Sequence, residues 1–98
     1  MRFVWDEVKD RLNWSKHKVS FETARAVFDD PFSMSVQDRI VGGEERWQTL
    51  GLMGGSVVLL VAHTYVDEAD EEIIRIISAR KATARERKIY AQGIEQPS

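Results

Sequence analysis

The first third of the chain places its apolar residues at helical spacing. A short apolar opening over residues 2–5 predicts a strand, and Asp6 is a favourable N-cap for a helix that follows it. Trp5, Val8 and Leu12 recur at i, i+3 and i+7, so they are expected to form the buried stripe of this helix.

A second helix is expected after a polar stretch, residues 13–20, which interrupts the first. Ser20 is a favourable N-cap at its start. Apolar side chains then recur on one face of the helix: Phe21, Ala24, Val27 and Phe28. Residues 29–31 end in a proline, which disfavours helical geometry in the residue before it, so the helix is expected to stop there.

Beyond residue 31 the pattern changes from helical spacing to alternation, which predicts strands. Four strands are expected, over residues 31–38, 46–53, 57–65 and 73–80. The first alternates apolar and polar residues and should have one face in solvent, whereas the third is apolar and suits a central strand. Glycine-rich turns and an acidic loop over residues 66–72 join them.

A final helix is expected after the last strand. Thr83 and Glu86 have the spacing of a capping box, and Gly93 is a natural place for the helix to end. A short strand, two helices, a four-stranded antiparallel meander and a C-terminal helix make an α+β domain in which helices cover a twisted sheet. The length suits one domain, so residues 1–98 are expected to fold together.

Composition narrows the class of protein. With 43% hydrophobic and 31% charged residues, the chain has the composition of an ordinary soluble globular domain. It contains no cysteine, which removes disulfides and thiolate metal sites. No basic-then-apolar leader opens it, and no apolar run approaches the ~20 residues of a membrane span. A cytoplasmic protein without membrane contact is therefore expected.

Charge is unevenly distributed, although the formal net charge is only -2. Residues 66–72 carry five acidic side chains and no basic one, while residues 75–88 carry six basic side chains against Glu86 alone. Because salt screens charges over about 8 Å at physiological ionic strength, a bound ligand responds to the charged side chains near it rather than to the net charge of the chain. The second block therefore predicts an anion-binding surface.

Two arginines stand among the apolar residues of the last expected strand. Strict alternation would place Arg75 and Arg80 on opposite faces of that strand, each among apolar neighbours. An unpaired buried charge is costly, so each guanidinium group needs a carboxylate, carbonyl groups or an anionic ligand. The sequence allows both a structural ion pair with Glu7, Glu22 or Glu44 and a bound phosphate.

Longer patterns resemble a known family. Three segments between residues 3 and 90 resemble the BrnT toxins of type II toxin–antitoxin systems: "FVWDEVKDRLNWSKHKVSFETARAVFDD", "GEERWQTLG" and "IIRIISARKATARERKIY". The most specific parts are the W-D-x-x-K opening, N-x-x-K-H followed by V-S-F, and R-I-I-S-A-R-x-A followed by E-R-x-x-Y. The resemblance implies a RelE-like fold and a ribonuclease activity that arrests translation.

The same resemblance implies a partner encoded beside the toxin. In that family the antitoxin is a ribbon–helix–helix DNA-binding protein, and the toxin–antitoxin complex represses its own operon. We therefore expect a BrnA-like ribbon–helix–helix antitoxin in a 2:2 complex, with RNA as the substrate. Operator DNA is expected to be contacted only through the antitoxin.

One position departs from the family pattern. Family members read K-H-G-V-S-F, whereas this chain reads K-H-K-V-S-F, with Lys18 in place of the glycine. If the position requires a positive φ, lysine carries strain there and changes how His17 is presented. The added charge can equally join a phosphate-binding surface.

The expected chemistry is RNA cleavage without a metal ion or cofactor. Two histidines and no carboxylate cluster with metal-ligand spacing favour attack of a ribose 2′-hydroxyl on the adjacent phosphate, which leaves a 2′,3′-cyclic end. Histidine titrates near ~6.5, so His17 is the first candidate for acid–base work, while Arg75 and Arg80 would stabilise transition-state charge. The candidate catalytic residues are His17, Arg75, Arg80 and Glu22, and the candidate RNA-binding residues are Lys16, Lys18, Arg46, Arg85 and Tyr90.

Several of these residues also have an ordinary structural explanation. Glu22 is a candidate base, but its place in the first turn of a helix equally suits the helix dipole. Tyr90 can stack on a base, hold a phosphate or pack at the edge of the core, and Arg85 can lie on a solvated helix face. His17 can simply end its helix, and His63 is expected to be packed or hydrogen-bonded in the central strand.

Two other classes of function stay open. A non-catalytic binding module could hold an acidic partner or nucleic acid on the same arginine surface without cutting it. A DNA-binding regulator acting alone agrees less well with the sequence, because no helix-turn-helix pattern is present.

Overall fold

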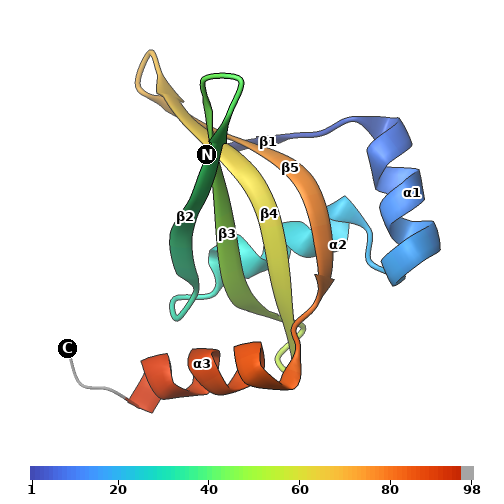
Figure 1. Cartoon of the computed structure of the whole chain (residues 1–98), viewed down its shortest axis with the longest axis vertical. Coiled ribbons are helices and arrows are strands. Elements are labelled where there is room, and N and C mark those ends of the chain that lie inside the picture. Colours follow the sequence, from blue (N-terminus) through green and yellow to red (C-terminus); the bar gives the residue numbers. More distant parts are fainter. Residues whose placement is uncertain (96–98) are drawn as a thin grey trace.

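The computed structural model describes residues 1–95, and its elements follow the order expected from the sequence (Figure 1). They are β1 (Arg2–Val4), α1 (Glu7–His17), α2 (Phe21–Ala24), the 3₁₀ helix η1 (Arg25–Asp29), β2 (Met34–Val41), β3 (Glu44–Met53), β4 (Val57–Glu68), β5 (Glu71–Lys81) and α3 (Ala84–Glu95). The predicted α+β class is therefore confirmed. No helix in this range is long and apolar enough to cross a membrane.

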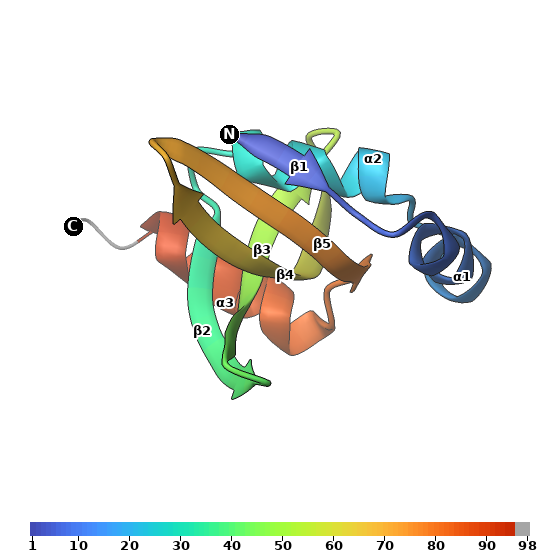
Figure 2. The same cartoon turned by 90° about the horizontal axis from the view of Figure 1, so that it is seen from above.

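One five-stranded sheet forms the centre of the molecule, in the order β1-β5-β4-β3-β2. The strands from β2 to β5 form an antiparallel meander, as the alternation predicted. β1 pairs with β5 in parallel, but only from Arg2 opposite Ile73 to Val4 opposite Arg75. The rest of that edge of β5 is left to α1, which lies beside it (Figures 1 and 2).

Helices lie on both faces of the sheet (Figure 2). α2 and η1 cover one face over a buried cluster of Val19, Phe21, Ala24, Val27, Leu59, Val61, Ile74, Ile76 and Ala79. α3 lies on the other face over a smaller cluster of Leu50, Val58, Leu60, Ala82 and Tyr90. α3 crosses only one end of its face, and the other end is left uncovered by helices (Figure 1).

The second helical segment comes very close to the sheet at Gly51. A Cβ atom added to this residue would lie 2.5 Å from the Val27 Cγ1 atom and 2.9 Å from the Val27 carbonyl oxygen. Glycine therefore lets η1 rest directly on β3, and Val27 is fully buried there.

A β-bulge between β4 and β5 changes which side chains share a face. Ala62 of β4 pairs with Ser78, and beyond this pair the register skips Ile77 of β5. The extra residue reverses the alternation, so that Arg75 and Arg80 emerge on the same face. The prediction that these arginines lie on opposite faces was wrong, because it assumed a regular strand.

α1 extends further than predicted, through the polar stretch to His17. Its buried side chain is Asn13, whose amide donates to the carbonyl oxygens of Val19 and Ala79, each over 2.8 Å. The Asn13 Oδ1 atom also accepts from the Ala79 N–H over 3.0 Å. A polar residue thus ties α1 to the edge of β5 and satisfies backbone groups that would otherwise lack partners.

Apolar side chains at the two flanks of the sheet are more exposed than predicted. Val8 and Leu12 of α1 are 54% and 63% exposed, so only Trp5 of the expected stripe packs against the core. In β2, which begins at Met34, Val36 is 59% exposed. The predicted burial of the α1 stripe was wrong, because the periodicity of a helix does not say which face meets another element.

The acidic segment is a hairpin rather than the predicted loop. β4 continues to Glu68 and β5 begins at Glu71, so only Ala69 and Asp70 form the turn. Both turn residues have a positive φ, of 51° and 63°, which is the conformation of two-residue turns between twisted strands. Acidic residues therefore pair across the strand ends, as Glu68 does with Glu71.

The capping box at the start of α3 is confirmed. The Glu86 N–H donates to Thr83 Oγ1 over 3.2 Å, and the Thr83 N–H donates to Glu86 Oε1 over 2.8 Å. The prediction that the helix ends at Gly93 was wrong, since the helix continues to Glu95. Gly93 instead allows close packing, because a Cβ atom there would lie 2.9 Å from the Met34 Sδ atom.

Candidate functional site

The face of the sheet that α3 leaves partly open carries a row of basic side chains. Cross-strand pairs run from Arg39 on β2 through Arg46 on β3 and Thr64 on β4 to Arg75 on β5. Paired residues share a face, so these guanidinium groups leave the sheet on the same side. We call the surface formed by Arg39, Arg46, Thr64 and Arg75 the arginine row.

One carboxylate serves two guanidinium groups of the arginine row. Glu44 lies two residues before Arg46 on β3 and therefore on the same face. Its Oε1 atom is 3.3 Å from Arg46 Nη2 and 2.5 Å from Arg75 Nη2. Glu44 is one of the structural partners that the sequence allowed for Arg75. A single negative charge between two positive charges still leaves the group cationic.

Arg46 has an unfilled hydrogen-bond donor. Its side chain is 25% exposed, while its Nε atom is buried and has no partner among the described residues. Buried polar groups of native proteins almost always find a partner, which a water molecule or a ligand oxygen would supply here. A phosphate oxygen is an acceptor of suitable charge.

Arg80 lies on the same face as the arginine row but has a partner of its own. Its two Nη atoms donate to the two carboxylate oxygens of Glu86, over 2.8 Å and 3.1 Å. The hydrogen bond from Arg80 is the main cause that lowers the pKa of Glu86 from 4.5 to about 2, and the same bond raises the pKa of Arg80. A phosphate would have to displace Glu86 to engage both Nη atoms.

His17 and Lys16 lie beside the edge of β5 rather than on the sheet. They line a cleft of about 210 Å³ between α1 and β5, together with Ile77 and Ser78. By its pairing, Ser78 shares its face with the arginine row. The structure thus brings His17 and Lys16 together at one flank of that face.

Lys18 has the left-handed backbone conformation that a glycine would suit. Its φ is 57° and its ψ is 33°, and its N–H donates to the Trp14 carbonyl oxygen at the end of α1. The positive φ considered from the sequence is therefore present, and lysine carries strain at this position. Its ammonium group lies 5.8 Å from the centre of the Trp14 ring and so packs on α1 itself.

Three further candidate residues lie apart from the arginine row. Glu22 is exposed in the first turn of α2 and pairs with Arg25 at 3.4 Å, and Arg85 is exposed on α3. Tyr90 is 5% exposed, and its hydroxyl donates to Asp30 Oδ2 over 2.5 Å. Burial, helped by the bond to Asp30, raises the pKa of Tyr90 to about 12. Tyr90 therefore joins α3 to the segment before β2. Of the roles considered from the sequence, this is packing at the edge of the core.

His63 is a buried, hydrogen-bonded residue, as predicted. It is 3% exposed, and burial lowers its pKa from 6.5 although a backbone hydrogen bond opposes this. Its Nδ1–H donates to the Thr64 carbonyl oxygen over 3.0 Å, so its Nε2 accepts from the Thr49 hydroxyl over 2.7 Å. A 2.7 Å bond between Thr49 and Ser35 extends this chain and ties β2, β3 and β4 together.

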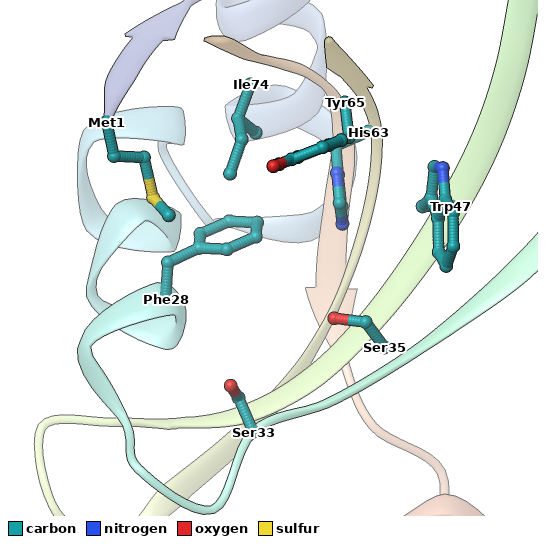
Figure 3. Close-up of a pocket in the computed structure, with 8 residues that line it drawn as sticks. All are labelled: Met1, Phe28, Ser33, Ser35, Trp47, His63, Tyr65 and Ile74. Carbon is teal, nitrogen blue, oxygen red and sulfur yellow. The ribbon is translucent and has the colours of Figure 1, made fainter. Parts of the chain in front are cut away.

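A pocket of about 360 Å³ lies next to His63, on the face that η1 covers (Figure 3). The rings of Phe28, Trp47 and Tyr65 line it, together with Ile74. None of the described residues that line this pocket is Lys, Arg, Asp or Glu. The candidate site is therefore the arginine row on the other face. Within residues 1–95, no three His, Asp or Glu side chains gather as metal ligands would.

Two features of the site were missed from the sequence. Arg39 joins the arginine row only through the register of β2 with β3, which is irregular between Gln37 and Arg39. The pairing of Arg80 with Glu86 was also missed. A signal for it was available, because the capping box fixes Glu86 in the first turn of α3, six residues after the end of the predicted strand.

Comparisons with known proteins identify the family. A sequence model described as "Ribonuclease toxin, BrnT, of type II toxin-antitoxin system" matches residues 5–86. The fold is similar to the crystal structure of the Brucella abortus ribonuclease toxin BrnT, with a TM-score of 0.67 and 25% sequence identity, over 85% of this chain and 97% of that one. A comparison with curated proteins finds no match. This chain therefore belongs to the BrnT family of ribonuclease toxins of type II toxin–antitoxin systems.

Proposed function

We propose that this chain cleaves RNA endonucleolytically at the arginine row and thereby inhibits translation. The observation that carries the proposal is the group of Arg46, Arg75 and Glu44, in which two guanidinium groups share one carboxylate and the Arg46 Nε–H has no acceptor. A phosphate bound there would meet two positive charges. Membership of a ribonuclease toxin family supports RNA as the source of that phosphate.

The proposed reaction is attack of a ribose 2′-hydroxyl on the adjacent phosphorus. A base removes the hydroxyl proton, the new P–O bond closes a 2′,3′-cyclic phosphate, and the bond to the 5′-oxygen breaks as that oxygen takes a proton. Arg46 and Arg75 would stabilise the charge of the phosphorane. The reaction needs a base, an acid and cations, all of which side chains can supply, so we propose that no metal ion takes part.

Glu44 is our candidate for the base. Its carboxylate contacts both guanidinium groups, so a phosphate bound by them would lie beside it. Glu22, which the sequence offered as a candidate base, lies on α2 and pairs with Arg25. His17 remains the candidate for the acid, because its cleft with Lys16 flanks the same face and histidine is a common general acid.

We further propose that a BrnA-like ribbon–helix–helix antitoxin neutralises this toxin in a 2:2 complex. A toxin of a type II system has a protein antitoxin, which the family assignment supports. The resemblance of the sequence segments to BrnT toxins supports the expectation that this antitoxin is a ribbon–helix–helix protein and that the complex is 2:2. The antitoxin would cover the arginine row, and it alone would contact operator DNA.

A non-catalytic anion-binding module is the second candidate. It is favoured by the pair of Arg80 and Glu86, in which a guanidinium group expected to bind phosphate is occupied by a carboxylate through two hydrogen bonds. If Arg75 pairs with Glu44 for the same structural reason, the surface would hold RNA or an acidic protein without cutting it.

Cleavage of end-labelled RNA by the purified chain in excess EDTA tests the proposal. We expect products with 2′,3′-cyclic phosphate and 5′-hydroxyl ends, and no cleavage when the ribose at the cut site carries a 2′-fluorine. Glu44→Gln should bind RNA but cleave it about 10²-fold more slowly or worse, because it lacks the base. Products with 3′-hydroxyl ends, or a need for added Mg²⁺, would contradict the mechanism. RNA bound but never cut would favour the second candidate.

A further inference from the structure

A groove lies between α3 and the strands beneath it. It measures about 240 Å³, and its walls include Val36, Gln48, Leu50, Leu60, Glu86 and Ile89. Most of these side chains are apolar, and Gln48 and Glu86 supply the polar groups. The volume is below the ~300–1,000 Å³ typical of pockets for drug-sized ligands and suits a single flat ring system. We call this cavity the α3 groove.

The sheet places Gln48 between the α3 groove and the arginine row. Gln48 lies two residues from Arg46 along β3, which is about 7 Å at ~3.4 Å per residue. Its cross-strand neighbour on β4 is Ala62, which pairs in turn with Ser78 on β5. Because the side chains of Ala62 and Ser78 are small, they do not block the path along the sheet from the guanidinium groups to the α3 groove. A strand of RNA with a phosphate on the arginine row would therefore bring a base to Gln48.

The two polar groups of the α3 groove differ in their hydrogen-bonding capacity. Both carboxylate oxygens of Glu86 accept from Arg80, and one of them also accepts from the Thr83 N–H. The Gln48 amide is uncharged, and it offers a hydrogen-bond donor and an acceptor side by side. Glutamine amides pair with the edges of nucleic-acid bases through such a donor and acceptor.

We propose that the α3 groove holds one base of the RNA strand and that the Gln48 amide pairs with the edge of this base. The apolar walls enclose the flat faces of the ring while the arginine row holds a phosphate of the same strand. Single-stranded RNA can present a base in this way, because its bases are not held in a duplex. Gln48 is thus a specificity-determining residue, and this assignment rests on the proposed function.

Binding of short, uncleavable RNAs tests the role of Gln48. Hexanucleotides of A, C or U with 2′-fluorine lack the attacking hydroxyl, and fluorescence anisotropy gives their Kd values. We expect the wild-type chain to prefer one of the three by about tenfold or more, and Gln48→Ala to bind all three within about twofold. Gln37→Ala is the matched control and should keep the preference, because Gln37 pairs with Trp47 on the opposite face of the sheet.

Gln48→Met is a second variant that fills similar space without an amide, and it should lose the preference as Gln48→Ala does. A preference that survives in both variants, or a wild-type chain that binds the three RNAs alike, would overturn the proposal. Loss of antitoxin binding in Gln48→Met with the RNA preference intact would also overturn it and assign the groove to the protein partner. Two failures of the proposed function are distinguishable from this one: Arg75→Ala would leave every Kd unchanged if the arginine row bound no phosphate, and unmodified RNA would be bound but not cut if the chain were a binding module.

Discussion

At the scale of single residues, the two glutamates of the arginine-bearing face balance charge differently. Glu44 lies between two guanidinium groups, whereas Glu86 is matched one to one with Arg80. In the first arrangement a positive charge remains and the Arg46 Nε atom has no acceptor among the described residues. In the second, both Nη atoms of Arg80 donate to Glu86. We therefore place phosphate binding at Arg46 and Arg75 and regard the Arg80 pair as an anchor for α3.

Lys18→Gly should stabilise the fold. A φ of 57° costs a residue with a Cβ atom about 1–2 kcal/mol, while glycine adopts it freely but loses more chain entropy on folding. The expected net gain is about 1 kcal/mol in the free energy of unfolding, measured by urea denaturation. Lys18→Ala is the control, since it removes the charge and keeps the Cβ atom. An equal gain in Lys18→Ala would place the cost on the charge and not on the backbone.

The sequence indicated which residues could form the site but not how they group. Arg75 stood out because a guanidinium group among the apolar residues of a strand needs a partner, and Arg46 was a candidate RNA-binding residue. That Glu44 serves both of them depends on the register of three strands, which no short segment encodes. For Tyr90 the sequence left open whether the ring faces RNA or the core, and its burial against Asp30 depends on the docking of α3.

At the scale of elements, the first turn of α3 is held to the sheet by Glu86, which accepts hydrogen bonds from Arg80 and Thr83. Folding lowers the pKa of Glu86 from 4.5 to about 2, so the unfolded chain takes up a proton first as the pH falls. The stability that this carboxylate contributes is present above about pH 4.5 and is lost as the pH falls towards 2.

Glu86→Gln should therefore destabilise the protein at pH 7 more than at pH 3. Because Arg80 is 39% exposed, solvent screening reduces the expected loss at pH 7 to about 1–2 kcal/mol. Urea denaturation of both proteins at the two pH values measures the difference. Glu45→Gln is the matched control on exposed β3 surface and should change stability little at either pH. A loss that is the same at both pH values would rule out the ion pair as its cause.

Local signals located the starts of helices better than they located strand register. The caps at Ser20 and Thr83 depend on residues within three positions, and both were predicted correctly. The bulge at Ile77 depends on the neighbouring strand, so alternation along β5 alone could not reveal it. Likewise, the periodicity of α1 did not reveal that Asn13, and not Leu12, faces β5.

At the scale of the whole molecule, the sheet separates two environments. The face under α2 and η1 holds the larger buried cluster and a pocket lined largely by aromatic rings (Figure 3), whereas the other face holds the arginine row and the α3 groove. The acidic hairpin between β4 and β5 lies at the end of the sheet away from α3 (Figure 1). The net charge of -2 is a property of the whole chain, whereas a bound ligand responds to the guanidinium groups that lie nearest to it.

The most direct test of phosphate binding at the arginine row is the kcat/KM for RNA cleavage by Arg75→Ala beside Arg2→Ala. Both arginines pair with a glutamate, Arg75 with Glu44 and Arg2 with Glu71, but only Arg75 belongs to the row. We expect Arg75→Ala to lower kcat/KM by about 10²-fold or more, because it removes a group that stabilises transition-state charge, and Arg2→Ala to stay within about twofold of wild type. Equal activity of the two variants would show that the arginine row serves the fold and not the phosphate.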